Sequence, residues 1–200
     1  MTANMSINFD SQEEKFFYDW LLELQEIGLI HTINYNPPSY SLCTEVVIKT
    51  EINTLVRGVV KPKQISRKII KSKSYTPDFI ILFKEGVCFE SILDCQDKPL
   101  IDLVISLDGF CYVDVKGAFT RNLTSSITFP DRQAMMYFNH SIYVNKVIPY
   151  SKKKCLFKDT FYPKSFIADQ IYKVGIKKGQ SKLIGEVRTI SDFIDKCKSL

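Results

Sequence analysis

Apolar residues recur at helical spacing near the start of the chain, where residues 9–30 read FDSQEEKFFYDWLLELQEIGLI. Ser11, followed three residues later by Glu14, matches a capping box, and Gly28 suits the end of a helix. The pattern therefore predicts an amphipathic helix with one face buried. Six apolar residues share that face: Phe16, Phe17, Trp20, Leu21, Leu24 and Ile27.

Several later segments are rich in β-branched and aromatic residues and predict strands. They are residues 31–36 and 40–50, which form two strands or one strand broken at Pro37 and Pro38, and then residues 75–83, 110–119 and 142–149. Residues 129–141 predict a helix with Pro130 at its first position, and residues 188–200 predict a short amphipathic helix. This order of elements predicts an α/β or α+β layer architecture around one mixed sheet.

Two segments give weaker signals. Residues 57–73 show little periodicity, so we expect a loop or an irregular edge there. Residues 84–109 contain two short apolar runs and an Asp-Gly turn, and they predict a hairpin-like insertion. The chain is long enough for one well-cored domain with an appendage.

Charge is uneven along the chain, although the formal net charge is only +5. Residues 57–73 carry seven basic residues and no acid, and ten lysines lie between Lys146 and Lys182. Such blocks either form a solvated face or bind a polyanion, most often a nucleic acid.

Other features exclude several classes of protein. No apolar run approaches the roughly 18–20 residues that a membrane-spanning helix needs, so no membrane partner is predicted. The N-terminus has no secretory pattern, and the six cysteines are scattered without zinc-ligand spacing, which favours a cytoplasmic protein with reduced thiols. We expect His31 and His140 to be structural, and there is no nucleotide-binding glycine pattern.

Two strands carry acidic residues where apolar ones are expected. In the segment YVDVKG, Asp114 and Lys116 project to one face of a strand, while Val113 and Val115 project to the other. The two charges could form an ion pair, or they could be a metal ligand beside a group that activates water. Asp78, in YTPDF, either caps a turn after Pro77 or joins the same site.

These segments together resemble the PD-(D/E)XK nuclease superfamily, and most closely its small phage-encoded endonuclease-like members. The resemblance covers roughly residues 9–148 and takes in Thr120 and the DRQAMM helix. Its motifs are S-x-x-E at Ser11–Glu14, Y-x-x-DF at Tyr75–Phe79 and D-V-K-G at Asp114–Gly117. The long spacing from Asp78 to Asp114 requires the insertion to leave both strands adjacent.

The resemblance implies a restriction-endonuclease-like mixed sheet flanked by helices over residues 1–149. Residues 150–200 lie outside the resemblance, and we expect them to form a basic C-terminal extension packed on the same domain. The resemblance also implies Mg²⁺ or Mn²⁺ bound by Asp78, Asp114 and the carbonyl of Val115, with Lys116 orienting or deprotonating the attacking water. Glu14 would bind a second metal or a metal-bound water, or serve only as the helix cap, with Glu13 as the alternative.

The expected partner is DNA, and the basic residues supply candidate contacts to its phosphates. The predicted contacts are Lys68, Lys71, Lys73, Thr120, Arg132 and Gln133. The resemblance implies a structure-selective endonuclease acting on branched or junction DNA in phage replication or recombination, for which a homodimer would provide two sites. The alternative is a non-catalytic DNA-binding or host-defence-interacting protein built on a nuclease fold.

Overall fold

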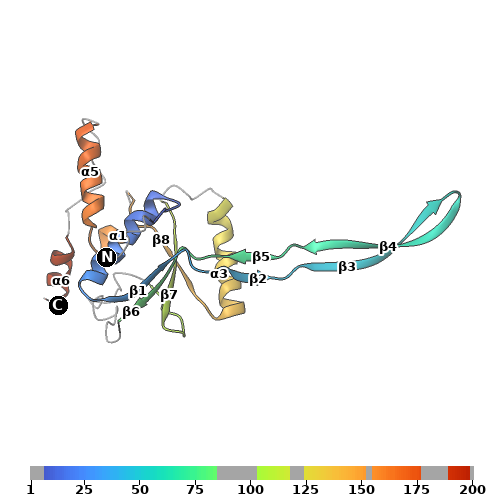
Figure 1. The fold of residues 1–200 in the computed structure, drawn as a ribbon, viewed down its shortest axis with the longest axis horizontal. Helices are drawn as coiled ribbons and strands as arrows, with labels where there is room; N and C mark the ends of the chain where they lie inside the picture. Colours follow the sequence, from blue (N-terminus) through green and yellow to red (C-terminus); the bar gives the residue numbers. More distant parts are fainter. Residues whose placement is uncertain (1–6, 85–102, 118–123, 152–154, 177–188, 199–200) are drawn as a thin grey trace, which may run out of the picture. The chain divides into compact units, whose positions relative to one another are not determined.

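The computed structural model describes residues 7–84, 103–117, 124–151, 155–176 and 189–198 (Figure 1). The chain forms two compact units. One, the sheet unit, comprises the residues up to Pro37 together with those from Pro77 onward. The other, the ribbon unit, spans residues 38–76. Most of the predicted insertion at 84–109 lies outside the described residues, as does Thr120.

The sheet unit is built on a four-stranded mixed sheet in the order β1-β6-β7-β8. Neighbouring strands are antiparallel except for β7 and β8, which are parallel. The strands are β1 (Ile30–Tyr35), β6 (Phe79–Phe83), β7 (Phe110–Val115) and β8 (Val144–Val147). The predicted α/β architecture around one mixed sheet is therefore confirmed.

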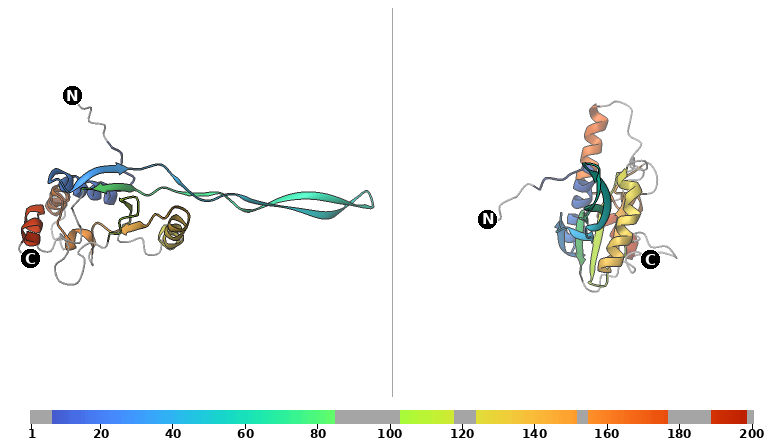
Figure 2. Two further views of the ribbon diagram at one scale, coloured as in Figure 1. Left: turned by 90° about the horizontal axis from the view of Figure 1, so that it is seen from below. Right: turned by 90° about the vertical axis from the view of Figure 1, so that its right-hand side faces the viewer.

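Helix α1 (Gln12–Glu26) covers one face of this sheet, and α3 (Thr124–His140) lies on the other face (Figure 2). Five of the six residues predicted to form the apolar face of α1 are buried, and they pack with Phe79, Ile81 and Val113 of the sheet. Ile27 is exposed instead, because the helix ends at Glu26 and Gly28 follows with a φ of +84°.

The C-terminal residues supply a large part of the same core. Helices α4 (Leu156–Asp159), α5 (Lys164–Ile176) and α6 (Ile190–Lys198) contribute Phe157, Phe166 and Phe193 to it. The Glu23 carboxylate of α1 accepts the backbone N–H of Lys164 at 2.6 Å, which satisfies a donor that the start of α5 would otherwise leave unbonded. Burial raises the pKa of Glu23.

The position predicted for Pro130 is wrong. Helix α3 begins at Thr124, so Pro130 lies inside the helix. Arg132 and Gln133 are therefore mid-helix residues, and the N–H groups of a helix start are not next to them to bind a phosphate. The Gln133 amide instead donates a 2.6 Å hydrogen bond to the carbonyl of Val144, which ties α3 to β8.

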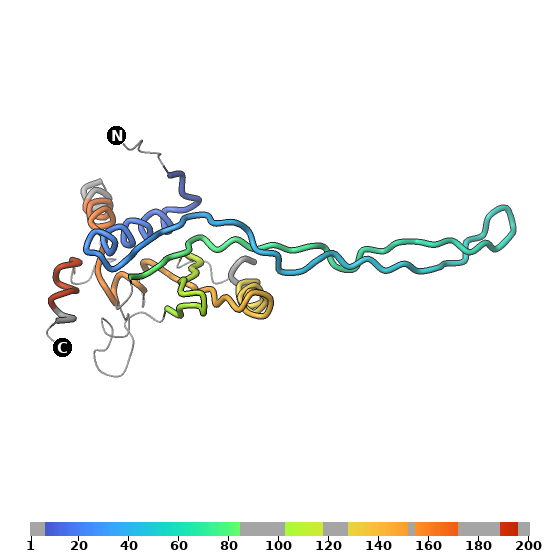
Figure 3. Tube along the Cα trace, turned by 60° about the horizontal axis from the view of Figure 1, so that its bottom comes forward, coloured from blue at the N-terminus to red at the C-terminus, as the bar shows by residue number. Residues whose placement is uncertain are grey.

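The ribbon unit consists of two antiparallel strand pairs, visible along the tube in Figure 3. Strand β2 (Tyr40–Cys43) pairs with β5 (Lys73–Tyr75), and β3 (Val46–Val56) pairs with β4 (Val59–Ile70). The predicted loop over residues 57–73 is thus wrong for most of its length. Strand β4 gave no periodic signal because nearly all of its residues are exposed, so neither face needs to be apolar.

Candidate active site

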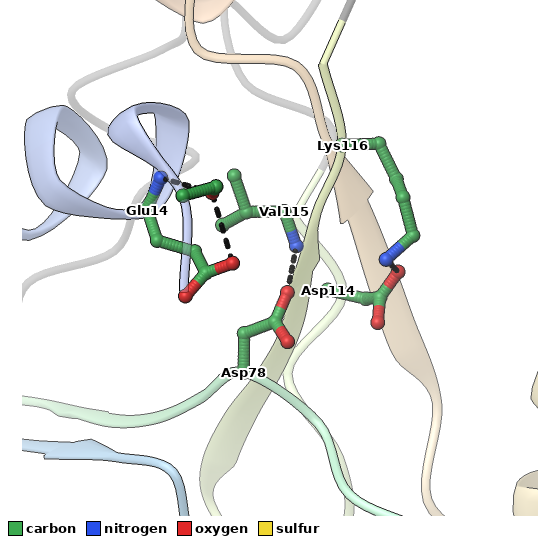
Figure 4. Close-up of polar contacts among 6 residues, drawn as sticks. Glu14, Asp78, Asp114, Val115 and Lys116 are labelled. Atoms are coloured by element: carbon green, nitrogen blue, oxygen red, sulfur yellow. Dashed lines mark hydrogen bonds and ion pairs between the residues drawn. The ribbon is translucent and has the colours of Figure 1, made fainter. Parts of the chain in front are cut away.

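The antiparallel register of β6 and β7 sets Asp78 against Asp114. Phe79 pairs with Val113, so the next position outward in the same register brings Asp78 opposite Asp114. Side chains at directly opposed positions of an antiparallel pair are close neighbours on one face. Figure 4 shows the two carboxylates with Lys116 beside them and Glu14 reaching in from the first turn of α1.

Asp78 takes the place of a missing backbone acceptor. Strand β6 begins at Phe79, and the carboxylate of Asp78 accepts the N–H of Val115 at 2.6 Å (Figure 4). This bond explains part of the role of Asp78 without any ligand, because a buried N–H needs an acceptor.

The pKa of Asp78 is raised to about 7, chiefly by burial and next by repulsion from Asp114. The ammonium of Lys116 and the Val115 N–H lower it in part, whereas the charge of Glu14 raises it. At neutral pH, negative charge on Asp78 is therefore costly unless a cation compensates it.

Asp114 and Lys116 form the ion pair that their spacing on one strand face allows. The Nζ of Lys116 lies 2.5 Å from Oδ2 of Asp114, and the Asp114 side chain is only 4% exposed (Figure 4). Val113 and Val115 point to the opposite face and pack in the core, as predicted. The predicted ion pair is therefore present.

Glu14 is held by three protein donors. Its carboxylate accepts hydrogen bonds from Ser11 Oγ at 2.9 Å, Tyr35 Oη at 2.8 Å and the N–H of Asp10 at 3.3 Å. Ser11 Oγ in turn accepts the N–H of Glu14 at 3.1 Å, so the predicted helix cap is confirmed. This bonding supports the structural role of Glu14, while its charge still acts on Asp78.

Glu13 lies against the glycine of the D-V-K-G motif. A Cβ at position 117 would lie 3.0 Å from Oε1 of Glu13, so a larger residue there would displace the glutamate. Glu13 also accepts a hydrogen bond from Tyr150, and burial together with this acid raises the pKa of Tyr150 to about 12. Glu13 is thus part of the packing beside the site.

Two further residues near the carboxylates were not predicted from the sequence. Tyr35, on β1, donates to Glu14, and no pattern in its segment marks it as special. Lys146 pairs with Asp114 in the parallel register of β7 and β8, and its Nζ lies 5.9 Å from the ring centroid of Phe129. The sequence does contain a hint of this second cation, because Lys146 lies between Asn145 and Val147, which are both buried in the strand.

The other predicted DNA contacts belong to other elements of the chain. Lys68, Lys71 and Lys73 belong to the ribbon unit, where Lys68 forms an ion pair with Glu45. Arg132 is exposed on α3. Their contact with DNA remains a prediction.

The donor atoms fit a hard cation that takes few protein ligands. Within the described residues, no group of three or more histidine, cysteine, aspartate or glutamate side chains is arranged to hold a metal ion. Mg²⁺, however, is commonly bound through one or two carboxylates while keeping several waters. Burial and the neighbouring Asp114 both raise the pKa of Asp78. A bound cation would relieve the repulsion between the two opposed carboxylates.

No helix among the described residues is long and apolar enough to cross a membrane. Comparisons of the chain with protein-family models, with curated proteins and with solved structures found no match.

Proposed function

We propose that this protein is a metal-dependent deoxyribonuclease with a restriction-endonuclease-like sheet of the PD-(D/E)XK type. The observation that carries the proposal is the placement of Asp78 opposite Asp114 at the ends of β6 and β7, with Lys116 paired beside them. These are the three side chains that the sequence motifs single out, and they come from segments 36 residues apart.

The proposed chemistry divides the work among these residues. Asp78 and Asp114, with the carbonyl of Val115, would hold Mg²⁺ or Mn²⁺, which supplies charge neutralisation and lowers the pKa of a bound water. Lys116 would donate a hydrogen bond from Nζ to the negative charge that develops on the phosphate, or orient the attacking water. Asp114 holds Lys116 in position through their ion pair.

Glu14 contributes to the site through its position and charge. Its three hydrogen bonds fix the first turn of α1. Its negative charge makes ionisation of Asp78 less favourable, and a bound cation would offset this effect. The substrate that we propose is branched or junction DNA in the cytoplasm of a phage-infected cell. A homodimer would present two such sites for cutting two strands.

The second candidate is a non-catalytic DNA-binding or host-defence-interacting protein. The observation favouring it is that both carboxylates engage protein donors, Asp78 the Val115 N–H and Asp114 the Lys116 ammonium. Each carboxylate then has a partner within the protein, and no ligand is needed to satisfy its hydrogen bonding.

Cleavage of a DNA panel separates the two candidates. Linear duplex, single strand, flap and four-way junction are incubated with Mg²⁺, Mn²⁺ or EDTA, using the wild type, Asp114→Asn and the control Asp195→Asn. The control makes the same chemical change at an exposed position of α6.

A nuclease is expected to cut at least one substrate with metal, to lose roughly 100-fold or more of that rate in Asp114→Asn, and to keep it in Asp195→Asn. Binding without cutting under every condition would establish the non-catalytic candidate. Cutting that survives in Asp114→Asn would remove the proposed site.

A further inference from the structure

The ribbon formed by β3 and β4 has two chemically different faces. In an antiparallel pair, directly opposed residues share a face, and successive pairs alternate between faces. The register pairs Ile48 with Arg67, Ile52 with Lys63 and Thr54 with Lys61, so all three basic residues lie on one face. We call this side the cationic face.

The cationic face carries no carboxylate. Its ten residues come from the even positions of 48–56 in β3 and the odd positions of 59–67 in β4, where the register is regular. They are Ile48, Thr50, Ile52, Thr54, Val56, Val59, Lys61, Lys63, Ile65 and Arg67. Several of its apolar side chains are also open to solvent, among them Ile52 at 40% and Val59 at 57% exposed.

The opposite face has a balanced charge. It holds Lys49 and Lys68, but Glu51 lies two residues from Lys49 on the same strand, and Lys68 is paired with Glu45. The three cations of the cationic face therefore have no acid on their own side of the ribbon, whereas each lysine of the opposite face has one nearby.

We infer that the cationic face of the β3–β4 ribbon is a docking surface for the groove and phosphates of duplex DNA. Phosphates attract a row of cations that has no internal acid, and a two-stranded ribbon fits the major groove in width. The exposed isoleucine, valine and threonine methyl groups can contact sugars and thymine methyls in the groove. The inference rests on the proposed function only for the choice of DNA as the polyanion, and it requires no cleavage.

Two other occupants fit this face less well. A second copy pairing through the same face would bring cations against cations, with no acid on either side to offset them. A membrane surface is disfavoured because residues 46–70 contain no aromatic residue to anchor at the interface, and the open edges of a two-stranded ribbon leave backbone groups unpaired in lipid.

The ribbon geometry is itself specified by sequence. Arg57 and Gly58 form a two-residue loop with φ values of +51° and +79°, and positive φ at both positions matches the twist of the flanking strands. Strand β3 is rich in β-branched residues, which favour an extended backbone. The register that separates the two faces is therefore fixed at the turn.

A charge-reversal pair tests the inference. Lys63→Glu changes the middle of the cationic face, and Lys49→Glu makes the same change at an exposed position of the opposite face. Binding of a fluorescent 25-base-pair duplex to the full-length protein is measured by anisotropy in EDTA over a series of salt concentrations. Thermal unfolding of each variant checks that the fold is kept.

We expect Lys63→Glu to weaken duplex binding at least 10-fold and to flatten the dependence on salt, and Lys49→Glu to weaken it less than 3-fold. Equal effects of the two variants, or no duplex binding by the wild type, would overturn the inference. It would also be overturned by wild-type binding to phosphatidylserine vesicles in place of DNA, or by self-association that Lys63→Glu abolishes. Because EDTA prevents metal-dependent cutting, these results are independent of whether Asp114→Asn removes cleavage.

Discussion

The sheet unit and the ribbon unit are stabilised in different ways. In the sheet unit, Phe17, Trp20 and Phe79 are fully buried, and aromatic rings from α1, the sheet and the C-terminal helices pack together. In the β3–β4 ribbon, Leu55 is 73% exposed and Ile52 is 40% exposed. A two-stranded ribbon without a core gains little from apolar burial, so its sequence is free to vary in charge.

The same contrast separates two kinds of candidate function. The sheet unit places acids where water is scarce, and the pKa of Asp78 is raised as a result. The ribbon places cations where water is abundant, on residues that do not contribute to a core. Buried charge suits chemistry at one point, whereas exposed charge suits contact with an extended polyanion.

The largest expected effect comes from removing a core ring. Phe17→Ala takes away a fully buried side chain that meets Phe79 edge-on at 5.1 Å between ring centroids. We expect it to lower the free energy of unfolding by about 3–5 kcal/mol, measured by urea denaturation.

The matched change in the ribbon is Leu55→Ala, which we expect to alter the free energy of unfolding by less than about 0.5 kcal/mol. Comparable losses in the two variants would show that the ribbon is buried in solution, and the comparison between the units would then fail.

We expect a smaller change in the free energy of unfolding when the pH is varied in the absence of metal. Folded Asp78 keeps its proton up to a pH of about 7, whereas an unfolded aspartate loses it near a pKa of about 3.9. The folded state binds more protons between these values, so the contribution of Asp78 to stability is lost as pH rises from about 4 to 7.

Asp78→Asn cannot ionise, and its amide oxygen can still accept the Val115 N–H. In EDTA we expect the wild type to lose about 1–3 kcal/mol more stability than this variant between pH 5 and pH 7.5. A difference between the two proteins that is the same at both pH values would mean that the pKa of Asp78 is not raised.

The buried elements of the sheet unit could be predicted from sequence, whereas the exposed strands of the ribbon unit were harder to predict. Helix α1 was predictable because burial of one face imposes a helical period on its apolar residues. The strands at Phe79–Phe83 and Phe110–Val115 were predictable because buried strands are rich in apolar, β-branched and aromatic residues. Strand β4 was missed because exposure removes that period, and Arg57-Gly58 was a weak hairpin signal since arginine seldom adopts positive φ.

At the candidate site, sequence could place Asp114 and Lys116 on one strand face because the strand period is fixed. The contact between Asp78 and Asp114 depended on the pairing of β6 with β7 across a long insertion, which only the family resemblance suggested. Tyr35 could not be foreseen as a partner of Glu14, because tertiary packing alone brings β1 against the first turn of α1.

The most direct test of the central claim is the binding of Mn²⁺ by the opposed carboxylates. Thermal unfolding is followed at pH 7.5 with 1 mM Mn²⁺ or with EDTA, for the wild type, the double variant Asp78→Asn/Asp114→Asn and the control Asp195→Asn. Because a ligand that binds only the folded state stabilises it, Mn²⁺ is expected to raise the Tm of the wild type and of the control by several degrees, and to leave the double variant within about 1 °C. An equal shift in all three proteins, or no shift in any, would contradict the assignment of Asp78 and Asp114 as a metal site.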